Sequence, residues 1–275
     1  MGDDFKSRLD AVRARIERAA RRAGRDPGGV ALVAVSKSVS VECLREAAAC
    51  GCRVFGENRV QEALAKMEVL DARAHAGKES EAPAAPGRAR GAGASEPIPM
   101  GGRAPDKINW HLIGPLQTNK IKAAVGRFAL LHAVDRLEVA ERLDRMARER
   151  GLTQAILLEV NVAGEKTKHG FSPDELVRLI ERMGAFQGIR VLGLMAIPPV
   201  VEAPEEARPF FRRLRMLAAE VQARRIPGVT MRELSMGMSG DFEVAVEEGA
   251  TLVRIGTALF GPREAETDFK SVPES

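Results

Sequence analysis

Val30-Ala-Leu-Val-Ala-Val-Ser-Lys37 is the stretch that decides the fold of this 275-residue chain. It is an apolar, valine-rich run bounded by Gly28-Gly29 on one side and by a polar exit on the other. Such a run predicts a strand buried on both faces, as in a parallel sheet, with Lys37 at its carboxyl end. Parallel sheets place their ligand sites at that end. Apolar neighbours are expected to desolvate Lys37 and favour the neutral amine that attacks aldehydes. The alternative is a strand-end lysine that only reaches into water.

The same strand-then-helix pattern repeats along the whole chain. Strands are predicted over residues 30–37, 53–58, 108–114, 129–134, 155–162, 191–197, 232–238 and 252–255. Helices are predicted over 41–49, 59–70, 119–125, 136–149, 173–183, 205–224 and 241–248, and an amphipathic helix over 5–23 precedes the first strand. Eight alternations predict an α/β protein, a single (β/α)8 TIM-type barrel domain over 1–275 with an extra N-terminal helix. A doubly wound open sheet is the alternative, but no Gly-x-Gly-x-x-Gly turn follows the first strand.

One segment, at about residues 72–106, breaks this pattern. Ala, Gly, Pro, Glu and Arg dominate it, and its hydrophobic periodicity is lost. Such a composition buries too little apolar surface to offset the entropy of ordering. We therefore predict a disordered insertion in a surface loop.

Composition narrows the class of protein. There are 42 basic and 38 acidic residues, and the basic ones are spread along amphipathic helices rather than clustered. With one Trp and no Tyr to stack on bases, nucleic acid is not an expected partner. Cys43, Cys50 and Cys52 have no zinc-like partners nearby and suit a reducing compartment without disulfides or a metal site. No apolar run is long enough for a bilayer, so we expect a cytoplasmic protein that does not enter membranes.

In a barrel, all the predicted strands end on one rim. The polar residues at those ends are Lys37, Asn58, residues 111–114, Asn161, residues 238–240 and residues 254–257. The ends of the seventh and eighth strands are where this fold commonly binds phosphate, through loop amides, small residues and a helix start. An amine on the first strand facing such a site suits a phosphorylated aldehyde, and pyridoxal phosphate is the obvious one.

Each rim residue also has a purely structural interpretation. Gly256 permits a turn, and Ser239 suits the cap of the next helix. His111 on its strand is either a hydrogen-bonded core histidine or a residue that faces a ligand. Glu57 is a candidate for ion pairs with the barrel. Arg254 lies within an apolar strand, so it must find a partner if it points into the barrel.

The motifs of this sequence resemble those of the pyridoxal phosphate homeostasis protein family. They are Val33-Ala-Val-Ser-Lys37, Phe55-Gly-Glu-Asn-Arg59, Trp110-His-Leu-Ile-Gly-Pro-Leu-Gln-Thr-Asn-Lys120, Gly193-Leu-Met195, Leu234-Ser-Met-Gly-Met-Ser239 with Asp241, and Val253-Arg-Ile-Gly-Thr257. Two features depart from the family pattern. The insertion is longer than usual, and His169 stands where a small residue is more common.

The resemblance implies a barrel similar to the N-terminal domain of alanine racemase, with pyridoxal 5'-phosphate held as an internal aldimine on Lys37. It further implies that Asn58 lies by the ring, that Arg254 faces the pyridine nitrogen, and that the phosphate is held by Met238, Ser239, Gly256 and Thr257. It implies a carrier and regulator of intracellular pyridoxal phosphate (vitamin B6), without established catalysis. We expect a monomer, with PLP-dependent apo-enzymes as recipients.

Two other functions compete with this one. A barrel that has lost the cofactor is disfavoured by Lys37 together with both phosphate-site strands. A racemase-like amino-acid enzyme needs two bases on opposite faces of the cofactor, and the tyrosine that serves the second face in alanine racemase has no counterpart in a chain without tyrosine. A guanidinium at Arg254 would also disfavour protonation of the pyridine nitrogen, which makes the ring a weaker electron sink.

Overall fold

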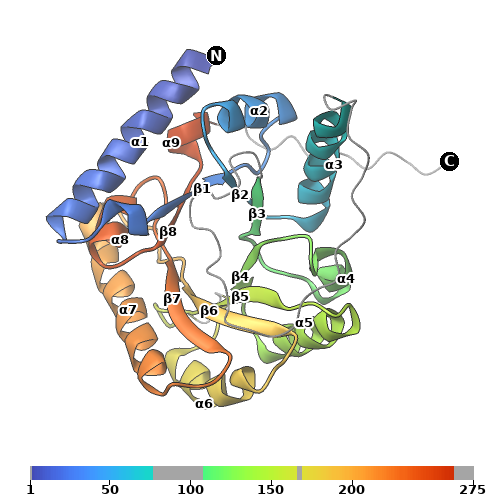
Figure 1. Ribbon diagram of the computed structural model, residues 1–275. Coiled ribbons are helices and arrows are strands. Elements are labelled where there is room, and N and C mark those ends of the chain that lie inside the picture. Colours follow the sequence, from blue (N-terminus) through green and yellow to red (C-terminus); the bar gives the residue numbers. More distant parts are fainter. Residues whose placement is uncertain (1, 77–107, 166–168, 263–275) are drawn as a thin grey trace.

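Eight parallel strands close into a barrel in chain order, and helices surround it (Figure 1). The computed structural model describes residues 2–76, 108–165 and 169–262. The strands are β1 Ala31–Val35, β2 Val54–Glu57, β3 Asn109–Leu112, β4 Leu130–Val134, β5 Gln154–Glu159, β6 Ile189–Met195, β7 Val229–Ser235 and β8 Leu252–Ile255. The predicted (β/α)8 barrel is confirmed, and the open sheet is wrong because β8 pairs with β1. A single domain over 1–275 stays a prediction.

The helices follow the predicted order. They are α1 Gly2–Arg22, α2 Val41–Ala49, α3 Val60–Ala76, α4 Ile121–Ala124, α5 Leu137–Glu149, α6 Pro173–Gly184, α7 Arg208–Ala223, α8 Phe242–Glu247 and α9 Thr257–Phe260. Short 3-10 turns lie at Pro27–Gly29, Thr118–Lys120 and Pro204–Ala207. Side-chain caps fix two of the starts: Ser40 Oγ accepts from Cys43 N at 3.3 Å, and Ser172 Oγ accepts from Glu175 N at 3.2 Å.

Several predicted boundaries need correction. The seventh strand runs over Val229–Ser235 rather than 232–238, because Gly237 adopts φ +91° and turns the chain away from the strand. The predicted helix 119–125 is a 3-10 turn followed by the four-residue α4. Helix α3 continues to Ala76, so it takes in the start of the predicted insertion. The rest of the insertion, residues 77–106, lies outside the described residues.

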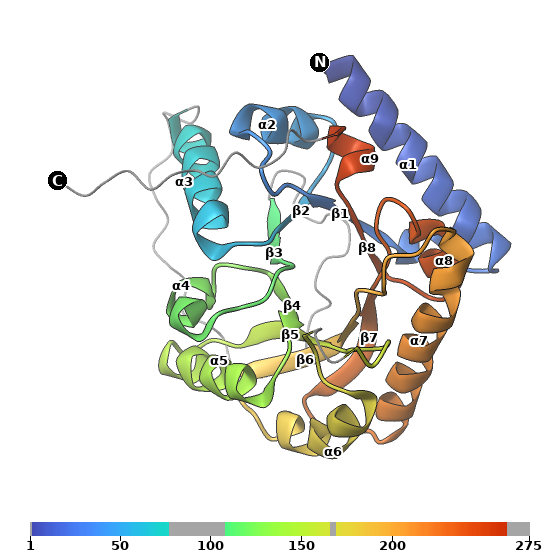
Figure 2. The same ribbon diagram turned by 180° about the vertical axis from the view of Figure 1, so that it is seen from behind.

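The N-terminal helix α1 takes the position of an eighth outer helix around the barrel. Within the described residues, which end at position 262, the only helix after β8 is the four-residue α9, which is too short to cover the strand wall. Helix α1 lies beside α8 and α9 in both views (Figures 1 and 2). The Phe5 ring packs 5.3 Å from that of Phe260, and Arg8 Nε donates to Leu259 O at 2.6 Å. The extra helix therefore closes the outer layer where β8 meets β1.

Side chains alternate between the two faces of the strand wall. Inside the barrel, a small apolar cluster contains Val33 and Val35 from β1, Ile113 after β3, and Leu252 from β8. The larger cluster lies outside, between strands and helices, and contains Phe55 of β2 and Met67 of α3. Within the described ranges, no helix is long and apolar enough to cross a membrane.

Candidate cofactor site

Lys37 lies on the rim where β1 ends. Val33 and Val35 point into the barrel, and Lys37 is the next residue in that alternation, just past the strand. Its side chain is exposed. The expectation that apolar neighbours desolvate Lys37 is therefore wrong, because the residue stands in the open beyond the end of β1. The structure instead presents an amine that is open to an incoming ligand.

The four strands β7, β8, β1 and β2 are neighbours, so their candidate residues share one arc of the rim. In the register, Ile255 of β8 lies opposite Ala34, and Val35 lies opposite Gly56 of β2. Ser235 of β7 lies opposite Leu252. The order around the rim is therefore the loop with Met238 and Ser239, the loop with Gly256 and Thr257, Lys37, and finally Asn58. The structure brings all of the predicted rim residues on these strands together.

Asn58 follows β2 directly and is half-buried. The loop after β3 packs closely on it: a Cβ added to Gly114 would lie 2.4 Å from Asn58 O. Only glycine leaves room for this approach. Asn58 is thus held closely through its backbone at the carboxyl end of β2.

The two predicted phosphate loops are joined by a hydrogen bond. Ala258 N donates to Ser239 Oγ at 3.3 Å, so the loop after β7 touches the first turn of α9. The residue that begins α8 is Asp241, whose Oδ1 accepts from Met238 N at 2.6 Å. The interpretation of Ser239 as the cap of α8 is therefore wrong. Gly256 directly precedes α9, and the Thr257 side chain is exposed.

Arg254 points into the barrel and has the partners that its burial requires. Its Nη1 donates to Ser235 Oγ at 2.6 Å, and its Nη2 donates to Ala196 O at 3.0 Å. Burial lowers the pKa of Arg254 to about 10, and the nearby carboxylates of Asp241 and Glu159 oppose that shift. The guanidinium is still charged at neutral pH. The prediction that Arg254 must find partners is confirmed.

Two buried histidines extend this contact across the barrel. His132 Nδ1 lies 2.8 Å from Ser235 Oγ, and His132 Nε2 lies 2.9 Å from His111 Nδ1. We call His111, His132, Ser235 and Arg254 the histidine chain. Arg254 can only donate, so Ser235 is free to donate its own proton to His132, which in turn donates to His111. Burial lowers the pKa of His111 to about 4. Burial, with the nearby His111 and Arg254, lowers the pKa of His132 well below 6.5, so both rings are neutral at neutral pH.

The histidine chain decides between the two interpretations of His111 and adds His132 to the predicted polar residues. His111 is the hydrogen-bonded core histidine, since its Nδ1 faces His132. His132 was missed by sequence reasoning, because a histidine in the apolar run 129–134 carries no signal of its partner. Only the position of β4 opposite β3 could have revealed it.

A second polar cluster lies just outside the strand wall, beneath Lys37. Lys66 Nζ donates to Ser36 O at 2.7 Å, to Glu57 Oε1 at 2.8 Å and to Glu62 Oε1 at 2.6 Å. Ser36 Oγ donates to Glu57 Oε1 at 2.6 Å, and Ser38 N donates to Glu62 Oε1 at 2.7 Å. We call Glu57, Glu62 and Lys66 the Lys66 clamp. Burial raises the pKa of Glu57, and its hydrogen bonds from Lys66 and Ser36 oppose that rise.

Sequence reasoning found part of this clamp. The interpretation of Glu57 as an ion-pair partner within the barrel is confirmed by Lys66. Glu62 and Lys66 were missed, since they occupy ordinary polar positions of a predicted helix. Their i,i+4 spacing is a signal for an ion pair, but it does not predict burial.

Two other polar residues noted in the sequence lie away from this arc. Asn161 binds within its own loop, where its Nδ2 donates to Glu165 O at 2.7 Å and its Oδ1 accepts from Gly164 N at 2.9 Å. His169 is exposed, and its Nδ1 lies 3.3 Å from Asp135 Oδ2. Neighbouring residues 166–168 lie outside the described part of the chain.

Comparison with known proteins gives the family. The profile described as alanine racemase, N-terminal domain, matches residues 7–264. The pyridoxal phosphate homeostasis protein of Aquifex aeolicus is 43% identical over 257 residues, which cover 94% of this chain and 97% of that protein. The chain belongs to the pyridoxal phosphate homeostasis protein family. The resemblance stated from the motifs is confirmed.

Other relatives agree with this assignment. The pyridoxal phosphate homeostasis protein of Pseudomonas aeruginosa is 41% identical over 254 residues, covering 92% of this chain and 93% of that one. The solved structure of PipY from Synechococcus elongatus PCC7942 with PLP bound superposes with a TM-score of 0.72 at 35% identity, covering 94% of this chain and all of that one (100%).

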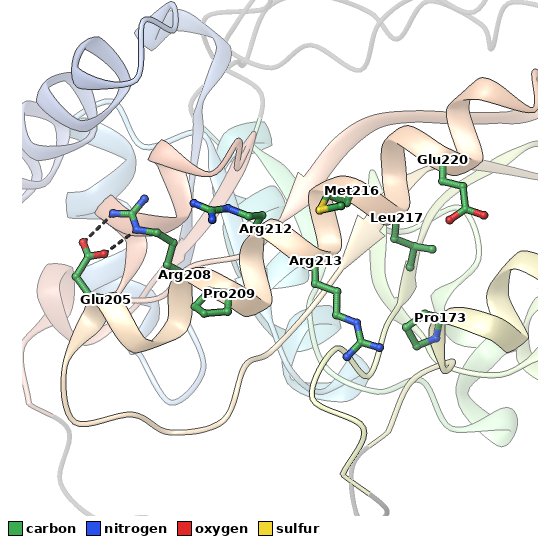
Figure 3. Close-up of a pocket in the computed structure, with 9 residues that line it drawn as sticks. All are labelled: Pro173, Glu205, Arg208, Pro209, Arg212, Arg213, Met216, Leu217 and Glu220. Carbon is green, nitrogen blue, oxygen red and sulfur yellow. Dashed lines mark hydrogen bonds and ion pairs between the residues drawn. The ribbon is translucent and has the colours of Figure 1, made fainter.

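This member of the pyridoxal phosphate homeostasis protein family also has a groove of about 630 Å³ on its outer surface, along α7 (Figure 3). None of the rim residues described above lines it. Its arginines already have partners: Arg208 pairs with Glu205 at 2.7 Å, and Arg212 pairs with Glu248 at 2.9 Å. The groove is therefore separate from the rim site.

Proposed function

We propose that this protein binds pyridoxal 5'-phosphate covalently through Lys37 and acts in pyridoxal phosphate (vitamin B6) homeostasis as a monomeric carrier in the cytoplasm. PLP-dependent apo-enzymes are the proposed recipients. The observation that carries the proposal is the single arc of the rim on which an exposed amine stands between Asn58 and two joined loops from β7 and β8. The names of the relatives and the PLP-bound PipY structure support it.

The residues on this arc fit the chemistry of the cofactor. Pyridoxal phosphate supplies an aldehyde that condenses with a primary amine. When the cofactor is bound, Lys37 would supply the amine nitrogen that condenses with this aldehyde, and the aldehyde oxygen would leave as water with the two amine protons. The exposure of Lys37 suits a site that must both load and release its cargo.

The phosphate is assigned to the loops after β7 and β8. Ser239 and Thr257 supply hydroxyl groups, and Gly256 supplies backbone just before α9. Met238 is assigned here from the family motif, and its own N–H already donates to Asp241 Oδ1 at 2.6 Å. Hydroxyl and backbone N–H donors at the ends of the last two strands are the usual phosphate ligands of this fold.

Arg254 favours a carrier over the racemase-like alternative. Only two of the five guanidinium N–H donors have the partners described above, so donors remain for an acceptor such as a ring nitrogen. A charged guanidinium beside that nitrogen would disfavour its protonation and so weaken the ring as an electron sink. His111 could in principle replace the missing tyrosine as a second base, but it is already bonded to His132 in the barrel interior.

The test is to incubate the purified protein with pyridoxal phosphate, reduce it with borohydride and map the labelled peptide. We expect a visible absorbance band that borohydride removes, and the phosphopyridoxyl group on Lys37. Lys122→Ala, which alters an exposed lysine on α4, is the matched control and should label normally. Labelling on another lysine of the wild-type protein, or none, would refute the proposal.

The phosphate assignment has its own test. Ser239→Ala combined with Thr257→Val should weaken pyridoxal phosphate at least about tenfold while unphosphorylated pyridoxal changes little, because each lost charge-assisted hydrogen bond is worth about 1.5–3 kcal/mol. Thr230→Val, an exposed change near the start of β7, serves as control. Equal weakening of both ligands would place the phosphate elsewhere. Equilibrium titration of the absorbance band, or of intrinsic fluorescence for pyridoxal, gives both affinities.

A further inference from the structure

Both peptide groups that flank Lys37 are bound by side chains of one helix. The carbonyl of Ser36, in the peptide before Lys37, accepts from Lys66 Nζ at 2.7 Å. The amide of Ser38, in the peptide after it, donates to Glu62 Oε1 at 2.7 Å. Lys66 and Glu62 lie one turn apart on α3 and pair at 2.6 Å. Helix α3 thus fixes the backbone on each side of Lys37.

The backbone here needs such support. Ser38 has φ +58°, a left-handed conformation that residues other than glycine rarely adopt. Backbone of this kind persists only when the surrounding structure fixes it, and it is concentrated at functional sites. The bond from Ser38 N to Glu62 fixes it here, directly after Lys37, together with the turn hydrogen bond from Val39 N to Ser36 O at 3.0 Å.

Lys66 itself is not a second amine for the cofactor. Its three N–H donors match three acceptors, Ser36 O, Glu57 Oε1 and Glu62 Oε1. Its side chain is only 9% exposed, and it lies outside the strand wall rather than on the rim. All the donors of the Lys66 amino group are therefore used in structural contacts. The position of this group helps to set the position of the Lys37 backbone.

We propose that Lys66, with Glu57 and Glu62, is a positioning group that sets the backbone of Lys37 for the covalent step without touching the cofactor. Glu57 contributes by fixing Lys66 and the Ser36 hydroxyl from β2. This inference rests on the proposed function, since it assigns a role toward Lys37 as the bonded lysine.

The experiment compares two ligands that differ only in the reacting group. Pyridoxine 5'-phosphate carries an alcohol in place of the aldehyde, so it reports binding without the bond to Lys37. We expect Lys66→Met to weaken pyridoxal phosphate by about tenfold or more, because small misplacement of a reacting group is costly, and to change pyridoxine 5'-phosphate less than about twofold. Equal effects on both ligands, or no effect on either, would overturn the inference.

A second readout needs no cofactor. In the protein without ligand, Lys66→Met should speed hydrogen exchange at the Ser38 amide, since Glu62 loses the group that orients it. Unchanged exchange at Ser38 would contradict the clamp. The double variant Glu57→Gln/Lys66→Met removes the uncompensated carboxylate and carries the same two tests if Lys66→Met does not fold.

The matched control is Asp144→Asn on α5. Asp144 is also a buried carboxylate in an ion pair, with Arg148 at 2.9 Å, and it accepts from Gly188 N at 2.6 Å, but it lies away from the rim arc. It should lower stability and leave the affinities for both ligands unchanged. If wild-type protein forms no reducible bond at Lys37, the proposed function fails. If it does and Lys66→Met keeps the wild-type ratio of affinities, only the positioning role fails.

Discussion

The two buried polar networks of the site lie on opposite sides of the strand wall. They differ in how their buried charges are compensated. The Lys66 clamp lies outside, between β2 and α3, and places opposite charges in direct contact at 2.6–2.8 Å. The histidine chain lies inside the barrel and links one charged group, Arg254, to neutral partners. Direct charge compensation makes the clamp sensitive to loss of either partner, whereas neutral histidines make the chain sensitive to acid.

The difference also separates two roles on the rim. The clamp binds backbone atoms at Ser36 and Ser38, so it acts on the position of Lys37. The chain binds the guanidinium of Arg254, so it acts on a side chain that faces the barrel interior. Substitutions that affect one network should therefore leave the other intact.

The largest effect is expected from Lys66→Met. It leaves Glu57 buried without its cation, and breaking a buried pair costs about 3–5 kcal/mol. The free energy of unfolding from urea titration at pH 8 measures this loss. Glu57→Gln/Lys66→Met should recover most of it, because no charge is then left buried. If the single and double variants are equally unstable, the loss comes from packing, and charge pairing in the Lys66 clamp does not stabilise the fold.

The second largest effect is expected from acid, which should destabilise the fold through the histidine chain. His111 has its pKa lowered from 6.5 to about 4 on folding, so between these values the unfolded chain binds the extra proton and the folded protein loses stability. The free energy of unfolding of the wild type minus that of His111→Gln should be constant above pH 6.5. This difference should fall by about 3 kcal/mol as the pH drops to 4. Urea titrations at several pH values give this difference. The exposed Ser7→Ala, which removes no titratable group, should give a flat difference, and a flat line for His111→Gln would mean that folding does not change the proton affinity of His111.

Ser235→Ala should give the smallest of the three effects. It removes the hydroxyl between Arg254 and His132 and leaves two buried groups short of a partner, at a cost of about 1–3 kcal/mol. The same denaturation assay measures it, and Ser7→Ala on the exposed side of α1 is the control. The Lys66 clamp should be untouched, so hydrogen exchange at Ser38 should match wild type. Faster exchange there would show that the two networks are coupled through the wall.

Residue types and their spacing predicted the barrel and most of the rim. The valine-rich run before Lys37 predicted a buried strand, and eight strand–helix alternations left few ways to bury it. The polar exits then fell on one rim, because parallel strands all end on the same side. Boundaries were less certain, as β7 shows: the run 232–238 looked extended until Gly237 turned the chain at positive φ.

What the sequence determined by itself was therefore local: the strands, the helices, and the residues at the strand ends. The tertiary structure alone decided which distant side chains meet. Helix α1 covers the wall beside α8 and α9, Lys66 reaches Ser36, and His132 reaches Ser235 across 103 positions of the chain. Such contacts depend on strand register and on the way each helix packs, and these are set by the whole core rather than by any local pattern of residues.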